Sequence, residues 1–385
     1  MVVVTGGPGV GKTTIVRGIV RLLGAAGLEV ALAAPTGRAA KRLSEATGRP
    51  AATLHRLLEW RPGEGNFGRN LKRPIDADVL VVDEASMVDV RLAADLFAAL
   101  PSGTRLVLVG DVDQLPSVGP GRVLADVIAS GRVRTVRLTE IFRQAAASLI
   151  VTNAHRINEG LPPELGAAPA GGPAADTRDF FFLEEDDPER AALLVRDLVV
   201  TRLPRRYGLE PHDVQVLSPM HKGPLGAANL NQLLQDALTA GAPELRRPAR
   251  VFRCGDRVMQ LRNNYDKEVW NGDVGRIERL DAEAGELLVR FDDREIPYDG
   301  DELDELGLAY AATVHKSQGS EYAAVVVPVH TQHYVMLQRN LLYTAVTRGK
   351  RLVVLVGSRK ALGIAVRNAD VAVRATRMMH RLRAG

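Results

Sequence analysis

Residues 6–13, which read GGPGVGKT, constrain the fold of this chain more than any other segment. They fit the pattern G-x-x-x-x-G-K-[ST], and they lie between an apolar run at residues 2–5 and a helical pattern at residues 13–23. Glycines in such a loop let the backbone curl so that its N–H groups point at phosphate oxygens, and the helix N-terminus adds partial positive charge. A glycine turn that merely caps a helix does not require this spacing and context. We therefore predict a phosphate-binding loop between a strand and a helix.

Two side chains of this loop have expected roles toward a bound nucleotide. Lys12 can reach the β- and γ-phosphates, and the Thr13 hydroxyl can bind Mg²⁺. ATP and Mg²⁺ are therefore the expected substrate and cofactor. The residues that we expect to surround the phosphates are Gly7, Pro8, Gly9, Val10, Gly11, Lys12, Thr13 and Thr14.

Polar side chains follow two further apolar runs. Asp83 and Glu84 come directly after residues 79–82, at what we expect to be the edge of a parallel sheet that also carries the phosphate loop. We expect Asp83 to hold Mg²⁺, directly or through water, and Glu84 to polarise the attacking water. Gln114, in GDVDQLP after residues 106–109, is placed to sense the γ-phosphate. Taken alone, a DE pair often only caps a helix and GDVDQLP is simply a polar turn.

Short β-branched runs alternate with amphipathic helical stretches, which predicts an α/β fold with parallel sheets covered on both faces. The alternation weakens at residues 161–177, a Pro-, Gly- and Ala-rich connector, and resumes after it. We therefore predict two α/β lobes, residues 1–140 and residues 141–385. The expected strands are residues 2–5, 30–34, 79–82, 106–109, 133–138, 180–183, 214–217, 324–327 and 352–356. The expected helices are residues 13–23, 38–47, 90–100, 189–200, 225–238 and 341–347.

Two insertions depart from this rhythm. Residues 60–76 (WRPGEGNFGRNLKRPID) combine glycines and prolines with basic side chains, which favours a projecting hairpin. Residues from about 250 to 303 contain short strand patterns separated by turns such as Asn271-Gly272, which is typical of a small β-barrel and not of a βαβ unit.

Composition narrows the class of protein only modestly. The net charge of +4 and the pI of about 9.3 lean weakly toward an anionic partner. Cys254 is the single cysteine, which excludes an internal disulfide and a cysteine-based metal cluster and fits a reducing cytoplasm. No run approaches the about 18 apolar residues of a membrane span, and the N-terminus does not have the pattern of a secretory signal.

The motifs match, in order and spacing, those of superfamily 1 helicases, and the chain resembles their RecD-like group. The matching segments are GGPGVGKTT, APTGRAAKRL, TLHRLL, VVDEASM, GDVDQLPSVGPG, LTEIFRQ, ATVHKSQGSEY and LLYTAVTRGK, which span almost the whole chain. The resemblance implies two RecA-like P-loop NTPase lobes that hold ATP between them. It also implies that residues 60–76 are a pin that splits the duplex and that residues 250–303 are an SH3-like insertion.

The resemblance adds residues that the phosphate chemistry alone does not single out. Arg143 and Arg348 are implied to stabilise charge on the γ-phosphate, both from the second lobe, and so to join Lys12, Asp83, Glu84 and Gln114 as catalytic residues. Glu321 is implied to contact the nucleotide sugar, with a surface carboxylate as the alternative. The residues implied to contact single-stranded DNA are Pro35, Thr36, His55, Thr313, His315, Lys316 and Ser317, of which the two histidines fit packed side chains as well.

The function implied by the resemblance is an ATP-dependent DNA helicase that moves 5′ to 3′ along single-stranded DNA and separates duplex junctions, with repair or recombination proteins as partners. An RNA-directed helicase and the motor half of a conjugative relaxase remain alternatives. A nucleotide-dependent switch or kinase would have no use for HKSQGSE and TAVTRG. Family members carry a glutamine-containing adenine-recognition segment, and usually a further domain, before the phosphate loop. Here the first strand begins at Met1, so we expect either the motor part of a longer protein or an incomplete adenine pocket.

Overall fold

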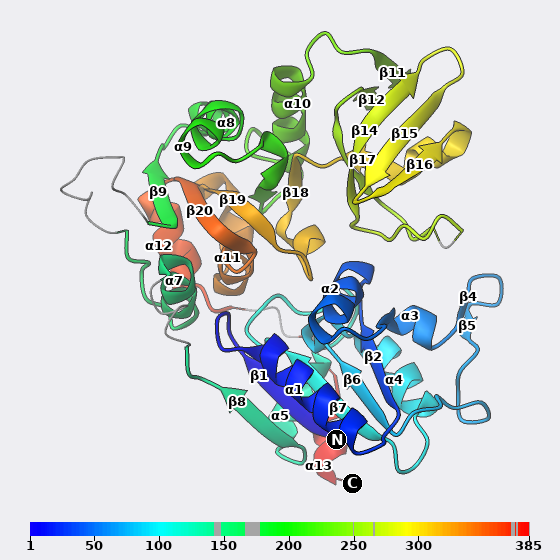
Figure 1. The fold of residues 1–385 in the computed structure, drawn as a ribbon. Helices are drawn as coiled ribbons and strands as arrows, with labels where there is room; N and C mark the ends of the chain where they lie inside the picture. The colour runs from blue at the N-terminus through cyan, green and yellow to red at the C-terminus, as the bar shows by residue number, and fades with distance from the viewer. Residues whose placement is uncertain are drawn as a thin grey trace. The chain divides into compact units, whose positions relative to one another are not determined.

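The computed structural model describes residues 1–141, 148–165, 178–248, 250–264, 266–370, 374 and 376–384. The chain forms two compact units, Met1–Ala147 with Asp370–Gly385, and Ser148–Ala369. Each unit contains a parallel sheet, which confirms the predicted α/β class (Figure 1). Among the described residues, no helix combines the length and the apolar character that crossing a membrane requires.

The first unit is built on a six-stranded parallel sheet in the order β3-β2-β6-β7-β1-β8. The sheet is covered on both faces: α1 and α2 pack on one face, and α4 and α5 on the other. β6 lies inside the sheet and reads VLVV, all four side chains being buried. The elements of this unit are β1 (Val2–Gly6), α1 (Lys12–Ala25), β2 (Val30–Ala34), α2 (Gly37–Thr47), β3 (Ala52–Thr53), α3 (Leu54–Leu57), β4 (Trp60–Arg61), β5 (Asn66–Phe67), β6 (Val79–Val82), η1 (Ala85–Met87), α4 (Val90–Ala99), β7 (Arg105–Gly110), α5 (Val123–Ser130), β8 (Arg134–Leu138) and α13 (Met378–Ala384).

The second unit is built on a five-stranded parallel sheet in the order β18-β10-β19-β20-β9. Its described elements outside the small β insertion are α7 (Leu149–Asn158), β9 (Phe180–Glu184), α8 (Pro188–Asp197), η3 (Leu198–Arg202), α9 (Leu203–Tyr207), η4 (Pro211–Asp213), β10 (Val214–Ser218), α10 (Ala227–Leu238), β18 (Ala311–Thr313), η6 (Val314–Ser317), β19 (Tyr322–Val329), η7 (Thr331–Met336), α11 (Arg339–Val346), β20 (Gly349–Gly357) and α12 (Arg359–Arg367).

The β-rich insertion predicted for residues 250–303 is an antiparallel sheet in the order β16-β15-β14-β13-β17, with its own apolar core. A two-stranded pair, β11 with β12, lies before it in the chain. The strands are β11 (Glu244–Arg247), β12 (Arg250–Arg253), β13 (Arg257–Gln260), β14 (Val274–Asp281), β15 (Glu286–Phe291), β16 (Arg294–Tyr298) and β17 (Leu306–Leu308), with the short helix η5 (Gly300–Glu305) before β17. The insertion extends slightly beyond the predicted residues because β17 pairs with β13 and completes the sheet.

The C-terminal residues belong to the first unit, although the sequence placed them in the second lobe. Helix α13 packs against α5 (Figure 1), and its Met378 and Leu382 contact the core formed with α4 and α5. This return of the chain depends on contacts between residues about 250 positions apart, such as Arg383 with Ala129.

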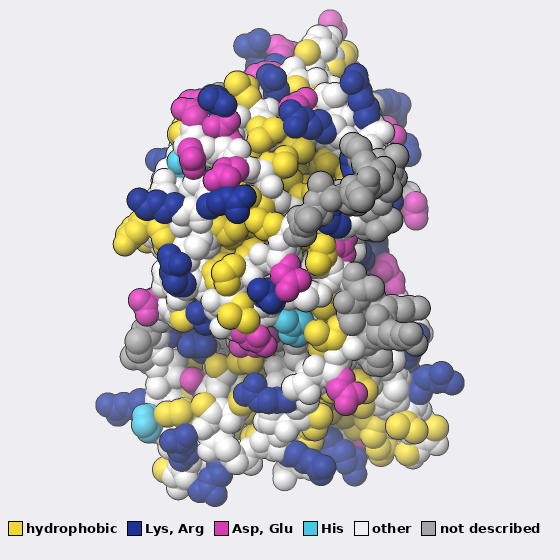
Figure 2. Space-filling view, turned by 90° about the vertical axis from the view of Figure 1, so that its left-hand side faces the viewer, with side chains coloured by type: hydrophobic (Ala, Val, Ile, Leu, Met, Phe, Trp, Pro, Cys, Tyr) yellow, Lys and Arg dark blue, Asp and Glu magenta, His cyan; other side chains and the backbone are white. Residues whose placement is uncertain are grey.

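Charge is dispersed on the surface that can be seen in Figure 2. Lysine and arginine side chains are interspersed with aspartate and glutamate over the upper part of the view, and basic side chains predominate along its lower margin. Composition alone therefore does not identify a surface for a polyanion, and any such binding must be argued from individual residues.

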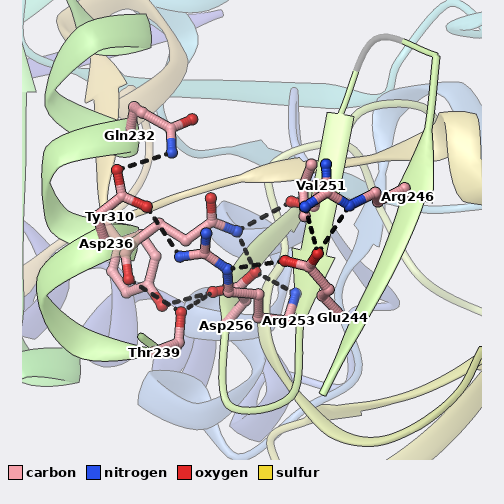
Figure 3. A network of polar contacts seen from close by, with 10 residues as sticks. Gln232, Asp236, Thr239, Glu244, Arg246, Val251, Arg253, Asp256 and Tyr310 are labelled. Atoms are coloured by element: carbon pink, nitrogen blue, oxygen red, sulfur yellow. Dashed lines mark hydrogen bonds and ion pairs between the residues drawn. The ribbon is translucent and has the colours of Figure 1, made fainter. Parts of the chain in front are cut away.

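A buried carboxylate joins the small β insertion to helix α10 (Figure 3). Asp256, just before β13, is fully buried and accepts hydrogen bonds from Gln235 Nε2 at 2.6 Å, Thr239 Oγ1 at 2.9 Å and Tyr310 Oη at 3.0 Å. The backbone N–H of Arg253 is a fourth donor, at 2.7 Å. Burial raises the pKa of Asp256, and the hydrogen bonds act in the opposite direction.

We expect Asp256→Ala to lower the free energy of unfolding of the second unit by about 3 kcal/mol, because it leaves several buried donors without an acceptor. Asp236→Ala is the matched control: its carboxylate is half-exposed and pairs with Arg253 at 2.9 Å, and losing such a pair costs about 1 kcal/mol or less. Urea denaturation of both variants measures the difference. Equal losses in the two variants would contradict a joining role for Asp256.

Candidate functional site

The predicted phosphate-binding loop connects β1 to α1. Gly9 and Gly11 adopt left-handed φ angles of 74° and 79°, a backbone of the kind that forms anion-binding nests of N–H groups. Gly11 is the N-cap of α1 and has no side chain to cap it, so the first-turn N–H groups depend on a ligand or on water. Lys12 folds back over the loop, and its Nζ donates to the carbonyl oxygens of Gly6 and Gly7 at 2.7 Å each.

The two predicted acids lie directly after β6 and close to this lysine. Burial, followed by the charge of Glu84, raises the pKa of Asp83 to about 6, while the N–H of Glu84 and the charges of Lys12 and Arg42 act against that rise. The N–H of Glu84 donates to Asp83 Oδ1 at 2.8 Å. Glu84 has a φ of 51°, which is unusual for a residue other than glycine. Such backbone conformations cluster at functional sites. The structure therefore brings together the lysine and both carboxylates.

The environment of Asp83 fits a bound divalent cation. Asp83 is partly buried, and the positive charges of Lys12 and Arg42 do not offset the effects of burial and of the neighbouring Glu84 on its pKa. A cation there would favour the ionised form of Asp83. The hydroxyl of Thr13, at the exposed start of α1, is the second oxygen that sequence reasoning assigned to the metal.

Gln114 is held at the end of β7 by a residue that the sequence analysis did not single out. Asp111 is 1% exposed; its Oδ2 accepts from Gln114 Nε2 at 3.1 Å, and its Oδ1 accepts from the N–H of Asp113 at the same distance. The first aspartate of GDVDQ thus orients the amide that we expect to sense the nucleotide. The signal that could have revealed it was its place directly after a buried strand.

The predicted DNA-contact residues of the first unit lie at the starts of two helices, α2 and α3, which directly follow β2 and β3. Thr36 is the N-cap of α2, and its hydroxyl accepts from the N–H of Ala39 at 3.3 Å, with Pro35 before it. His55 is half-buried on α3, and burial lowers its pKa while the charge of Asp89 raises it.

An aromatic cluster surrounds His55. Its ring lies 6.2 Å from Trp60 and 5.7 Å from Phe67, and the rings of Trp60 and Phe67 lie 4.8 Å apart. The ring of His55 packs against the hairpin, as a structural side chain would. It is also only partly covered, which is compatible with the proposed contact to DNA.

The predicted DNA-contact residues of the second unit lie on the short helix η6 and at its N-cap. Thr313 is its N-cap, Lys316 is exposed, and His315 is half-buried. Ser317 is fully buried, and its hydroxyl donates to the Val314 carbonyl at 2.7 Å. Among these four side chains, Lys316 has the exposure that a direct phosphate contact needs, whereas the hydroxyl of Ser317 points into the protein.

The remaining residues predicted to contact the nucleotide are Arg348, Glu321 and Arg143. Arg348 is 2% exposed, and its guanidinium donates to the carbonyls of Thr344 and Ser320 and to the Thr347 hydroxyl. Glu321 Oε2 lies 3.2 Å from Lys350 Nζ. Arg143 lies outside the described residues.

Three family models match successive parts of the chain. They are an AAA domain at residues 1–120, an ATP-dependent RecD-like DNA helicase SH3 domain at residues 230–291, and a UvrD-like helicase C-terminal domain at residues 308–356. The second match overlaps the antiparallel sheet described above.

Similar proteins cover the chain almost completely. The ATP-dependent RecD2 DNA helicase of Deinococcus radiodurans is 42% identical over 100% of this chain and 50% of its own length. The RecBCD enzyme subunit RecD of Mycobacterium tuberculosis is 35% identical over 99% of this chain and 70% of its own length. The chain thus spans half of the first relative. A crystal structure of a Bacteroides Pif1 helicase with ADP-AlF3 and ssDNA has a TM-score of 0.55 at 20% identity and covers 98% of this chain and 90% of its own, which shows a shared fold.

Proposed function

Because this chain belongs to the RecD-like family of superfamily 1 helicases, we propose that it is an ATP-dependent DNA helicase that moves 5′ to 3′ along single-stranded DNA and separates the duplex ahead of it. The observation that carries the proposal is the grouping of Lys12, Asp83 and Glu84 at the carboxyl edge of the first sheet. A phosphate loop with its lysine, together with two acids at the same sheet edge, supplies the groups that phosphoryl transfer to water needs.

Each of these residues has a distinct part in ATP hydrolysis. Lys12, released from the Gly6 and Gly7 carbonyls, binds the β- and γ-phosphates, and the loop N–H groups orient them. Glu84 polarises the attacking water, and Gln114, oriented by Asp111, positions that water against the γ-phosphate. Thr13 and Asp83 would hold Mg²⁺, which supplies charge neutralisation on the phosphate oxygens.

The second unit contributes residues to the same reaction in this proposal. Arg348, and Arg143 with it, stabilise the charge that develops on the γ-phosphate, and Glu321 contacts the nucleotide sugar. The hydrogen bonds of Arg348 to Thr344, Ser320 and Thr347 support this role, because they fix the orientation of its guanidinium before any nucleotide arrives.

The strand is bound mainly through its phosphates in this proposal. Thr36 and Thr313 are hydroxyl residues at helix N-caps, and Lys316 adds an exposed cation, which suits contacts that fix register without reading bases. Pro35, His55, His315 and Ser317 line or support the same path.

Binding to single-stranded DNA should therefore weaken steeply with salt and vary little with base sequence. Each neutralised phosphate contributes about −0.7 to the slope of log affinity against log salt, so Lys316→Ala should make that slope shallower by about 0.7. Lys360→Ala, an exposed lysine on α12, should leave the slope unchanged. Fluorescence anisotropy at several salt concentrations measures both, and a nearly salt-independent, sequence-specific interaction would contradict this mode of binding.

The central experiment is unwinding of duplexes that carry a 5′ or a 3′ single-stranded tail. We expect ATP-dependent unwinding of the 5′-tailed duplex and ATPase stimulation by single-stranded DNA. Stimulation by RNA instead would favour an RNA-directed helicase, and turnover indifferent to either nucleic acid would contradict a motor function. Unwinding of the 3′-tailed duplex alone would reverse the proposed direction.

A further inference from the structure

The C-terminal residues of the chain hold the loop that follows Gln114. Arg374 Nη1 donates to three backbone carbonyls of this loop, those of Ser117, of Gly119 at 2.8 Å and of Gly121 at 3.3 Å. The Ser117 hydroxyl also donates to the Gly119 and Gly121 carbonyls, at 3.2 and 3.4 Å. Three carbonyl oxygens that converge on one point repel one another, and a guanidinium at that point offsets the repulsion.

Described residues that follow Arg374 shortly afterwards in the chain contact α5 and the core of the first unit. The Thr376 hydroxyl donates to Asp126 on α5, and Met378 and Leu382 of α13 pack on the core of the first unit. Arg383 Nη2 donates to the Ala129 carbonyl at 2.6 Å. Residues 376–384 are therefore held against α5 and the core of the first unit, and Arg374 binds the loop shortly before them in the chain. We call Arg374 together with residues 376–384 the C-terminal clasp.

The loop under the clasp also touches the segment that carries the catalytic acids. The Pro120 carbonyl accepts from the N–H of Val90 at 2.9 Å, at the start of α4. A Cβ on Gly119 would lie 2.0 Å from Asp89 Oδ2, so this close approach to the N-cap of α4 requires glycine. Asp89 and Val90 follow Glu84 by only a few residues. Loop 117–121 continues the chain after Gln114. It therefore links the segment of Gln114 to the segment that follows Asp83 and Glu84.

The same two segments meet again at the sheet edge. A Cβ on Gly110, directly before Asp111, would lie 3.1 Å from the backbone nitrogens of Ala85 and Ser86, directly after Glu84. The segment that carries Glu84 and the segment that carries Gln114 therefore meet twice. They pack together where they leave the sheet, and they contact each other again through loop 117–121.

We propose that Arg374 is a positioning residue for ATP hydrolysis, which fixes the segment of Gln114 against the segment of Glu84 by neutralising the carbonyls of Ser117, Gly119 and Gly121. The inference rests on the proposed ATPase function. Because Arg374 follows the last helix of the second unit in the chain, the clasp makes the hydrolysis loops of the first unit dependent on residues that the chain reaches only after completing the second.

The test compares Arg374→Ala and Arg374→Lys with Arg381→Ala, an exposed arginine of α13 whose side chain is not part of these contacts. We expect Arg374→Ala to lower kcat of the DNA-stimulated ATPase by about tenfold or more, since small misplacements of catalytic groups have effects up to about 10²-fold. KM for ATP should stay near the parent value, because Lys12 and the phosphate loop are untouched. Arg374→Lys should recover part of kcat, and Arg381→Ala should match the parent.

Hydrogen–deuterium exchange of the nucleotide-free proteins tests the clasp without any activity. Peptides covering residues 111–121 and 84–92 should exchange faster in Arg374→Ala than in the parent and in Arg381→Ala, with little change in peptides of α1. Unchanged exchange in residues 111–121 would overturn the clasp even if the parent proves to be an active helicase. Faster exchange with parental kcat would overturn the positioning role, and a parent without ATPase would refute the proposed function and leave the exchange result to judge the clasp.

Discussion

Lys12→Ala should abolish ATP turnover while leaving nucleotide-free binding of single-stranded DNA largely intact. The structure gives the reason: Lys12 Nζ makes its two described hydrogen bonds to the carbonyls of Gly6 and Gly7, at the end of β1 and the start of the loop, so its removal takes away the phosphate contact and breaks only local contacts of the same segment. Steady-state ATPase and DNA-binding assays on the same preparation measure the two effects. Near-normal turnover in a correctly folded variant would refute the site assignment.

Glu84→Gln is the matched variant for this experiment. Glutamine keeps the size of the side chain but cannot polarise water as a base, so ATP should still bind while hydrolysis falls. Binding of a fluorescent ATP analogue separates the two variants. If Glu84→Gln loses nucleotide binding as completely as Lys12→Ala, the division of roles between phosphate and water is wrong.

The strands and the phosphate loop could be predicted from the sequence because their signals are local. β2 and β6 begin and end at the predicted residues, since a run that is buried in a parallel sheet is apolar throughout and stops where the sheet edge meets water. The sequence also led us to expect Asp83 and Glu84 near Lys12, because parallel strands of one sheet end at the same edge, and the charges of Lys12 and Glu84 do act on Asp83. The roles assigned to these residues stay predictions.

What the sequence did not predict depends on contacts between distant residues. Arg374 is one of many arginines, and only the return of the chain to α5 brings it to the carbonyls after Gln114. Asp256 joins the β insertion to α10 through hydrogen bonds from Gln235, Thr239 and Tyr310, none of which adjoins it in the chain.

Burial of individual side chains was also beyond the sequence. Ser317 has a suitable hydroxyl, but at the end of the short helix η6 that hydroxyl donates to the Val314 carbonyl. A motif gives the residue type at each position, whereas exposure follows from the packing around it.

Residues 60–76 form a hairpin with a second reversal, as the structure of the first unit shows. β4 and β5 pair through Trp60 with Phe67, and Asn70 pairs with Arg73 in the following turn. The segment is fastened at its base, where Glu59 lies 2.9 Å from Arg69 Nε and 2.6 Å from Arg73 Nη1. These contacts argue against a loose surface loop and support its proposed role as the pin.

Replacing residues 62–73 with a short Gly-Ser link should therefore abolish or sharply reduce unwinding while keeping strand-stimulated ATPase and single-strand translocation. Movement needs only the two units and the strand, whereas separating a duplex needs a rigid obstacle where the strands part. Leu71 is exposed in the second reversal, between Asn70 and Arg73, and Lys72 beside it is a cation that suits a phosphate. Unwinding of a 5′-tailed duplex, expressed per ATP hydrolysed, measures the effect.

The replacement also removes Phe67, which packs against Trp60 and the predicted strand contact His55. Phe67→Leu is therefore the matched control, because it disturbs the aromatic cluster but keeps both reversals of the hairpin. We expect this control to unwind at close to the parent's rate per ATP, since the obstacle remains in place. If Phe67→Leu loses unwinding as fully as the shortened protein, the effect belongs to the surroundings of His55. If the shortened protein unwinds tailed duplexes as well as the parent, the pin lies elsewhere in the chain.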